Sequence, residues 1–293
     1  MPKILITGAN SFVGRNFIKH SQFKDIDEVS LLKAKPETID FGRYDVVLHL
    51  AAIVHRSDKI PADKYFQVNR DLCLSVAKVA KSSGVKHFIF LSSSNVYGNQ
   101  NSDTVFTEDS LCNPEDPYGK SKYEAELLLN KLGSSDFTIS IIRTPIVYGE
   151  GVKANMLNII RLIDTFPVLP FKGIINKRSI TFVENLVSMI DKIIETRSSG
   201  TFLITDDKPL STTELVKYIS KYLGKKILLF KLPGFIVSAL TCISPRKMNS
   251  LFGSSILDNS KSRRDLNFNP PVSTEEGIKR MVLHYNAMKS AGN

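Results

Sequence analysis

The chain has 293 residues, 42% of them hydrophobic and 23% charged, enough for one large α/β domain with an appended lobe. Its cysteines, Cys73, Cys112 and Cys242, are odd in number and widely spaced, which argues against a disulfide framework or a metal site and predicts a reducing cytoplasm. The net charge is +10, but the sequence has no long run of lysines and arginines. This pattern favours anionic small ligands or anionic surfaces over nucleic acid as binding partners.

A short apolar strand at residues 3–7 runs into a glycine turn at 8–14 and then a helix at 15–20. This order predicts a dinucleotide-binding turn, because a helix N-terminus there offers free N–H groups to a pyrophosphate. Gly8 permits the turn and Gly14 permits close packing of helix on strand. Ser11 stands where a strict pattern has glycine, and its hydroxyl can reach a phosphate. The predicted cofactor-binding residues are Gly8, Asn10, Ser11, Phe12, Val13 and Gly14.

The second strand is predicted at residues 28–32. An NAD site usually has an acidic residue at this strand's end, whereas Lys33 and Lys35 follow here, which favours NADP slightly over NAD. The alternative is that both lysines are merely solvated. The segment before Tyr44 is too short for a full crossover helix, so an atypical adenosine pocket is expected.

Two further strands are predicted to end beside the cofactor. Residues 45–52 form a buried strand that finishes in Leu50, Ala51 and Ala52, and the small side chains at this end let a cofactor approach the backbone. After a helix at 66–82, the strand at 85–91 ends in Ser93, Ser94 and Asn95. A serine at a strand tip can donate to a substrate oxygen, or it can simply stabilise a turn.

Tyr118 and Lys122 lie one turn apart on the helix that begins at Pro117. A free tyrosine has a pKa of about 10, and a nearby ammonium lowers it towards the range useful for acid–base catalysis. The alternative is that both are ordinary surface residues.

Repeated alternation of strand and helix, continued by a strand at 137–143, predicts a Rossmann-type, doubly wound parallel sheet. The second half predicts a smaller α/β lobe, with a capping box at Ser211 and Glu214. We expect residues 1–150 to bind the cofactor, with 180–206 returning to that domain, and residues 151–179 and 207–293 to form the substrate-binding lobe. The apolar segment 233–244 is flanked by lysines and arginines and is too short to span a bilayer. A helix packed within the lobe is favoured there over contact with a membrane surface.

Together these residues resemble the extended short-chain dehydrogenase/reductase family, in its sugar-nucleotide epimerase, dehydratase and reductase branch. The resemblance covers nearly the whole chain. The motifs that carry it are Thr7-Gly8-x-x-Ser11-x-x-Gly14, Leu50-Ala51-Ala52, Asn69, Ser92-Ser93-Ser94-Asn95-Val96-Tyr97-Gly98, Tyr118-x-x-x-Lys122, Arg143-Thr144-Pro145-x-x-Tyr148-Gly149 and Arg178-x-x-x-x-Val183. The stretches 151–155 and 258–261 look closest to bacterial enzymes that act on UDP-N-acetyl sugars for surface polysaccharides.

The resemblance implies a role for each matching position. Tyr118 would be the acid/base, Lys122 would lower its pKa and hold the nicotinamide ribose, and Ser93 would hydrogen-bond the reacting sugar oxygen. Asn69 would support the site. Substrate would be bound by Ser94, Asn95, Asn155 and Arg178, the last two holding its diphosphate. Because Ser94 and Asn95 replace the acidic pair of the family's dehydratases, dehydratase chemistry is not expected.

The expected protein is therefore a cytoplasmic NAD- or NADP-dependent enzyme acting at C4 of a nucleotide sugar. A UDP-N-acetyl-sugar 4-ketoreductase is favoured, with a UDP-sugar 4-epimerase that retains NAD as the alternative and a non-catalytic NADP-binding sensor as the second alternative. A homodimer is compatible with the family.

Overall fold

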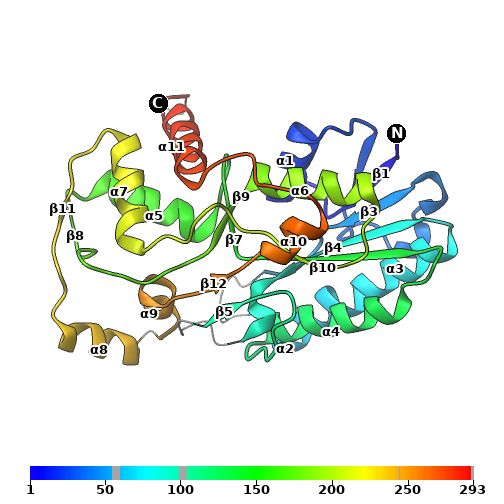
Figure 1. The fold of residues 1–293 in the computed structure, drawn as a ribbon, viewed down its shortest axis with the longest axis horizontal. Coiled ribbons are helices and arrows are strands. Elements are labelled where there is room, and N and C mark those ends of the chain that lie inside the picture. Colours follow the sequence, from blue (N-terminus) through cyan, green and yellow to red (C-terminus); the bar gives the residue numbers. More distant parts are fainter. Residues whose placement is uncertain (55–59, 99–103, 244, 292–293) are drawn as a thin grey trace.

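Six parallel strands form the central sheet of the computed structural model, which describes residues 1–54, 60–98, 104–243 and 245–291 (Figure 1). Within these, only the backbone is described at 239–240, 245–247 and 250. The strand order is β10-β6-β4-β3-β1-β2. These strands are β1 (Ile4–Thr7), β2 (Ile26–Val29), β3 (Val46–His49), β4 (His87–Ser93), β6 (Thr138–Thr144) and β10 (Gly200–Leu203). The parallel, doubly wound sheet expected from the sequence is confirmed.

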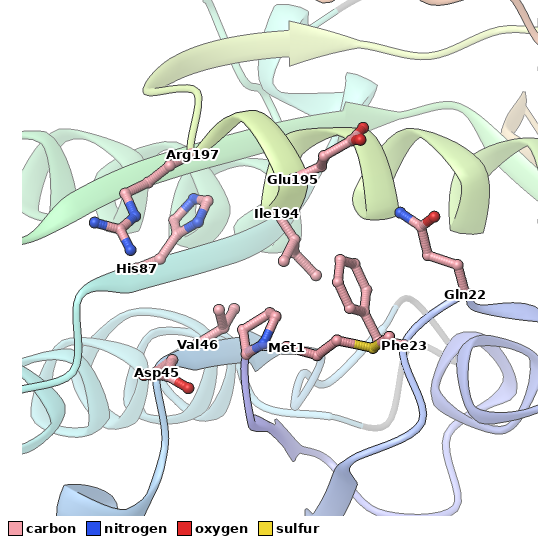
Figure 2. Close-up of a pocket in the computed structure, with 10 residues that line it drawn as sticks. Met1, Gln22, Phe23, Asp45, Val46, His87, Ile194, Glu195 and Arg197 are labelled. Atoms are coloured by element: carbon pink, nitrogen blue, oxygen red, sulfur yellow. The ribbon is translucent and has the colours of Figure 1, made fainter.

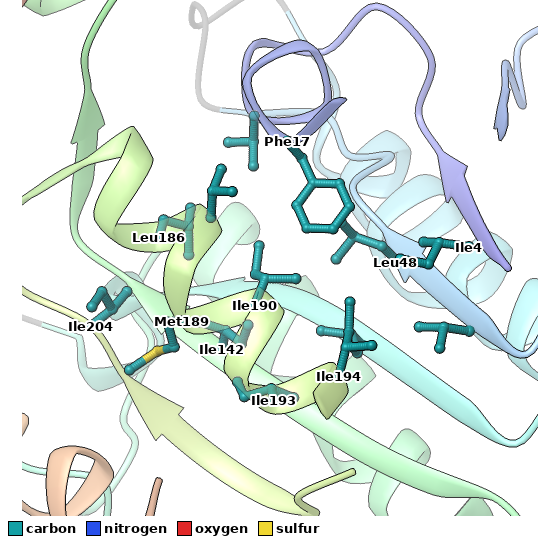
Figure 3. Packing of buried hydrophobic residues seen from close by; sticks show 14 of the residues in the cluster. Ile4, Phe17, Leu48, Ile142, Leu186, Met189, Ile190, Ile193, Ile194 and Ile204 are labelled. Atoms are coloured by element: carbon teal, nitrogen blue, oxygen red, sulfur yellow. The ribbon is translucent and has the colours of Figure 1, made fainter. Parts of the chain in front are cut away.

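Helices cover both faces of this sheet because its buried strands are apolar on both sides. In β1, Ile4 and Ile6 face one layer and Leu5 faces the other. The first layer contains α1 (Phe12–His20) and α6 (Val183–Thr196), whose apolar faces meet the sheet in one core (Figure 3). The opposite layer contains α3 (Cys73–Ser82) and α4 (Pro117–Leu132).

The second strand differs from its prediction: β2 ends at Val29, whereas the sequence placed the strand at 28–32. It is an edge strand paired only with β1, and the Val29 carbonyl already accepts from Gly8 and Ala9 of the glycine turn. The chain then leaves the sheet, so Leu32 is 98% exposed. As expected, no full crossover helix follows. Two short 3₁₀ helices, η1 (Pro36–Thr38) and η2 (Phe41–Arg43), lead to β3.

Several short elements surround the carboxyl ends of the strands of the central sheet. The predicted helix at 66–82 is interrupted: α2 (Ala62–Tyr65) is followed by a π-helical segment before α3. These connecting elements are η3 (Phe66–Leu72), η4 (Ser94–Tyr97), β5 (Val105–Phe106), α10 (Ser260–Asp265) and β12 (Ile256–Leu257).

A second hydrophobic core lies in the smaller lobe, built mostly from α5, α7 and α11 around β7 and β9. The capping box predicted at Ser211 and Glu214 is confirmed at the start of α7. The elements of this region are β7 (Ile146–Tyr148), α5 (Ala154–Thr165), β8 (Val168–Leu169), β9 (Ile180–Phe182), α7 (Thr212–Leu223), β11 (Leu228–Leu229), α8 (Gly234–Ile243), α9 (Pro245–Phe252) and α11 (Thr274–Ala291). The division into domains expected above stays a prediction.

The apolar segment at 233–244 forms α8, which lies beside α9 at the outer edge of the lobe (Figure 1). Phe235 and Ile243 are 76% and 77% exposed, so this helix is not packed within the lobe as expected. The lobe's core is already filled by α5, α7 and α11. Residue 244 lies outside the described part of the chain. Among the described helices, none has the length and apolar character needed to cross a bilayer.

Candidate active site

The glycine turn after β1 comes into close contact with the end of β3. Gly8 has φ = 110°, and a Cβ there would lie 2.6 Å from the Ala51 backbone nitrogen. Only glycine fits this contact. The turn and the Leu50-Ala51-Ala52 segment therefore meet at the point where strand order reverses between β1 and β3, which is where ligands bind in sheets of this kind.

Ser11 is the N-cap of α1, and its hydroxyl accepts from the backbone N–H of Gly14 at 3.1 Å. A Cβ on Gly14 would lie 2.7 Å from that hydroxyl oxygen, which explains the glycine. Phe12 and Val13 form the first turn of α1, so their N–H groups have no intrahelical acceptor. These residues fit a dinucleotide pyrophosphate, because the turn leaves backbone and N–H groups, not side chains, at the helix N-terminus.

An acidic residue that the sequence patterns did not predict lies beside this turn. The Glu28 carboxylate accepts from the backbone N–H of Asn10 at 3.2 Å, and Asn10 itself has φ = 61°. Glu28 is the penultimate residue of β2 and is exposed. Once the end of β2 is placed correctly, an acid lies at the strand's end, contrary to the expectation. Lys33 and Lys35 are exposed beyond it.

The helix α4 carries Tyr118 and Lys122 into the same region. Asp116 caps it by accepting from Gly119 at 2.6 Å, and Pro117 begins the first turn. A Cβ on Gly119 would lie 2.7 Å from the Asn95 carbonyl oxygen, so this glycine lets α4 contact the segment after β4. Tyr118 is therefore held beside the strand tip that carries Ser93.

Ser93 and Tyr118 are brought together as expected. The Ser93 hydroxyl interacts with the phenol and lowers its pKa, but burial has the larger effect and raises the pKa of Tyr118 to about 12. The Tyr65 ring packs edge-on against the phenol ring with centroids 6.4 Å apart.

Lys122 is 2% exposed, and its ammonium donates to the Leu91 carbonyl at 2.8 Å. It also lies 4.4 Å from the centroid of the Phe90 ring. Burial lowers the pKa of Lys122 to about 8. The ammonium is not among the groups that shift the phenol's pKa. The lowering of the Tyr118 pKa by Lys122 therefore stays a prediction for the cofactor-bound enzyme.

A buried histidine lies beneath this lysine. His49 Nδ1 is 2.7 Å from the Thr7 hydroxyl, while its Nε2 has no partner among the described residues. Burial, aided by the Lys122 charge, lowers the pKa of His49 to about 3, so the ring is neutral. A neutral ring is what lets Lys122 remain close to it.

Asn69 supports the site from the π-helical segment η3. Its side chain accepts from the Ile53 N–H at 2.8 Å and donates to the Ile53 carbonyl and the Ser121 hydroxyl. It thus ties the chain after β3 to α4 between Tyr118 and Lys122. π-helical turns are frequent at functional sites because they redirect one side chain out of the helical register.

A buried ion pair behind the site was not foreseen. Glu126, one turn after Lys122, binds Arg143 of β6 at 2.7 Å, and their side chains are 2% and 8% exposed. The Ser92 hydroxyl also donates to Glu126. The sequence marked Arg143 as part of a motif, but partners 17 residues apart on different elements leave no local pattern.

The residues expected to hold substrate fall into two groups. Ser94 and Asn95 begin the short helix η4, and the Asn95 N–H donates to Ser93 Oγ at 3.2 Å. Asn155 and Arg178 line a small cavity in the lobe, together with Leu251. The Arg178 guanidinium donates there to the carbonyls of Asn249 and Gly253. Their binding of a diphosphate stays a prediction.

A larger pocket of about 870 Å³ lies at the opposite edge of the sheet (Figure 2). It is lined by Val46 and His87, the first residues of β3 and β4, so it faces away from the strand tips that carry Ser93. Burial lowers the pKa of His87 to about 4. We assign no catalytic role to it. No cluster of metal-ligating side chains occurs among the residues that the structure describes.

A doubly wound sheet with a glycine turn and a Ser–Tyr–Lys arrangement at its strand tips defines a dinucleotide-dependent oxidoreductase class. The sequence profile of the NAD-dependent epimerase/dehydratase family matches residues 26–204. A UDP-glucose 4-epimerase from Vibrio cholerae is 34% identical, over 96% of this chain and 94% of that protein. The chain belongs to the NAD-dependent epimerase/dehydratase family, whose members use a nicotinamide cofactor.

Two further proteins widen the comparison. An N-acetyl-α-D-glucosaminyl-diphospho-ditrans,octacis-undecaprenol 4-epimerase from Escherichia coli O157:H7 is 28% identical over 78% of this chain and 75% of its own length. The solved dTDP-4-dehydrorhamnose reductase of Bacillus anthracis, in complex with NADP, has a TM-score of 0.75 at 21% identity, covering 97% of this chain and 99% of that one. The last likeness shows the shared fold.

Proposed function

We propose that this protein interconverts the two C4 configurations of a UDP-linked sugar and retains NAD between turnovers. The single observation that carries this choice is the Glu28 carboxylate at the glycine turn. In folds of this kind an acid there binds the ribose 2′-hydroxyl of NAD, whereas the 2′-phosphate of NADP would meet a like charge. The 34% identical relative is named for this reaction, which supports the proposal.

Each step at the sugar is assigned to a residue of the chain. NAD, when bound, would supply the hydride acceptor and donor for C4. Tyr118 removes the proton from the C4 hydroxyl and later gives it back, Ser93 holds that oxygen, and Lys122 holds the ribose and favours the phenolate. Asn155 and Arg178 hold the diphosphate. For the configuration at C4 to invert, the keto sugar would have to turn over within the site.

A 4-ketoreductase acting on a UDP-N-acetyl sugar, the reaction favoured by the sequence, is the second candidate. It uses the same Tyr118, Lys122 and Ser93, and the exposed Lys33 and Lys35 beyond β2 are the observation that favours it, because they can attract a 2′-phosphate. Consumption of the cofactor distinguishes the epimerase from the reductase. An epimerase co-purifies with NAD and needs no added cofactor, whereas a reductase consumes NADPH or NADH in proportion to product.

Mass spectrometry of the cofactor released from the purified protein, followed by NMR of UDP-sugars incubated with it, tests the choice. Retained NAD and conversion without added cofactor are expected. Stoichiometric oxidation of NADPH by a UDP-4-keto sugar, without epimerisation, would reject the epimerase in favour of the reductase.

The acid–base role is tested by Tyr118→Phe, which removes the proton-transferring hydroxyl and little binding surface. We expect turnover to fall by about 10²–10⁴-fold with cofactor affinity nearly unchanged. Tyr123→Phe, on the same helix, is the matched control and is expected to retain activity. Equal activity of Tyr118→Phe and wild type would refute the assignment.

A further inference from the structure

We propose that the outer edge of the smaller lobe docks on an anionic membrane surface, with α8 lying in the plane of the interface. α8 contains no charged residue, and its ends expose Phe235 and Ile243 to solvent. Ten residues are too few to cross a bilayer, which needs about 20, but an uncharged helix with exposed large side chains can lie in the headgroup region.

A lysine-rich groove adjoins this helix. Its volume is about 1130 Å³, and its lining includes the exposed Ile175 and one acidic residue, Glu214. Glu214 is already engaged in the capping box of α7. Six lysines line the groove: Lys172, Lys177, Lys217, Lys221, Lys225 and Lys226. Lys221 and Lys225 are paired with Glu275 and Asp164. For the other four, no ion pair occurs within the described ranges.

The groove contacts the segment that leads into α8 and the end of the helix that packs against α8. The Lys172 N–H donates to the Phe230 carbonyl, and residues 231–233 lead directly from there into α8. On the other side, the Asn176 side chain donates to the Leu251 and Gly253 carbonyls at the end of α9, which lies beside α8 (Figure 1). Apolar side chains and unpaired ammonium groups are therefore presented together.

The positive charge of the groove distinguishes a second copy of this chain from an anionic membrane as the binding partner. Two copies of this surface would oppose lysines to lysines, which disfavours self-association. An anionic bilayer instead receives the apolar side chains of α8 among its acyl chains and the lysines among its headgroups, and each lysine near such a surface adds roughly a fivefold gain in binding. Lys177 directly precedes Arg178, so the docked surface would border the cavity expected to hold the substrate diphosphate.

This docking adds a partner to the proposed function but does not depend on the reaction. The test is sedimentation of the full chain with phosphatidylcholine vesicles, either alone or containing about 30 mol% phosphatidylglycerol. We expect binding to the anionic vesicles only, weakening as salt is raised. Tyr118→Phe should bind equally, so loss of the reaction and loss of docking are distinguishable.

Two variants separate the apolar and charged contributions. Phe235→Ser combined with Ile243→Ser should lower vesicle binding at least about tenfold, and replacing Lys172, Lys177 and Lys226 by Gln should lower it roughly a hundredfold. The matched control is Leu127→Ser, because Leu127 is 44% exposed on α4, which lies far from α8 along the long axis of the molecule in Figure 1. It should bind as wild type.

Thermal unfolding and activity on soluble UDP-sugar should be unchanged in all three variants, since the altered side chains are exposed. The proposal is overturned if wild type does not bind anionic vesicles, if the apolar and the lysine variants both bind as well as wild type, or if Phe235→Ser with Ile243→Ser instead dissociates a dimer. Capture of an acidic protein with no vesicle binding would likewise overturn it and assign the surface to that class of partner.

Discussion

Lys122 shows at the scale of one residue how a group proposed to act in catalysis reduces stability. Its ammonium is almost completely buried, with one carbonyl acceptor and the face of Phe90 as compensation. Burial holds its pKa at about 8, below the ordinary 10.5. Because the unfolded chain binds this proton more tightly, the charged lysine opposes folding below about pH 8, and the opposition disappears as pH rises through 8 to 10.5.

Replacing Lys122 by Met should therefore stabilise the protein while abolishing function. At pH 7 we expect the free energy of unfolding to rise by roughly 1–3 kcal/mol, because a buried charge that is only partly compensated is removed, and turnover to fall at least about a hundredfold. Urea unfolding and steady-state assays measure the two effects. Lys120→Met, exposed on the same helix, should change neither by much. A less stable Lys122→Met protein would contradict this account.

At the scale of elements, α4 positions the site because one of its faces carries Tyr118, Lys122 and Glu126 on successive turns. The first two face the strand tips, and the third is bound to Arg143 of β6 and to Ser92 of β4. Arg143 also donates to the Tyr97 hydroxyl at 3.1 Å and to the Glu108 carbonyl. The buried pair thus fixes the helix against two strands of the sheet.

Breaking this pair should be costly. Glu126→Gln leaves the Arg143 guanidinium buried without a counter-charge, and we expect a loss of about 3–5 kcal/mol in urea unfolding. Replacing both residues, Glu126→Leu with Arg143→Met, should recover most of that loss. Glu124→Gln, which removes an exposed partner of Arg70, is the control and should cost less than about 1 kcal/mol. Equal losses in the two single variants would show that the buried pair does not anchor α4.

At the scale of the whole molecule, Asp206 joins the sheet to the smaller lobe. Its carboxylate accepts from the Tyr148 hydroxyl at 2.7 Å, the Asn185 amide at 2.7 Å and the Phe182 N–H at 2.8 Å. Asn185 in turn donates to the Val272 carbonyl in the segment before α11. Burial outweighs these donors and raises the pKa of Asp206 to about 6.

This carboxyl makes stability depend on pH. Its folded pKa lies above the unfolded value of about 3.9, so between about pH 4 and 6 the folded chain binds the extra proton and stability falls as pH rises. The contribution is about 3 kcal/mol. Asp206→Asn, which keeps the shape, should remove this slope from urea unfolding measured across that range. A slope identical to that of wild type would show that Asp206 ionises normally.

Local patterns in the sequence were enough to predict most of the fold and to single out the candidate pair Tyr118 and Lys122. The strands and helices of the sheet follow from apolar runs and alternation, and Gly8, Gly14 and Tyr118-x-x-x-Lys122 are recognised by spacing because turns and helix faces are local. The edge strand β2 was misplaced because apolar residues alone continue past Val29, whereas its end is set by pairing with β1.

The sequence alone determined which residues meet within one turn or one helix, because backbone geometry fixes those distances. Tertiary structure alone decided which partners the charged side chains meet. It places Glu28 against the Asn10 N–H and Glu126 against Arg143, and it gathers lysines from three separate segments around one groove. The physical reason is that burial and Coulomb interactions depend on distances in space, and these distances cannot be read from the spacing of residues along the chain.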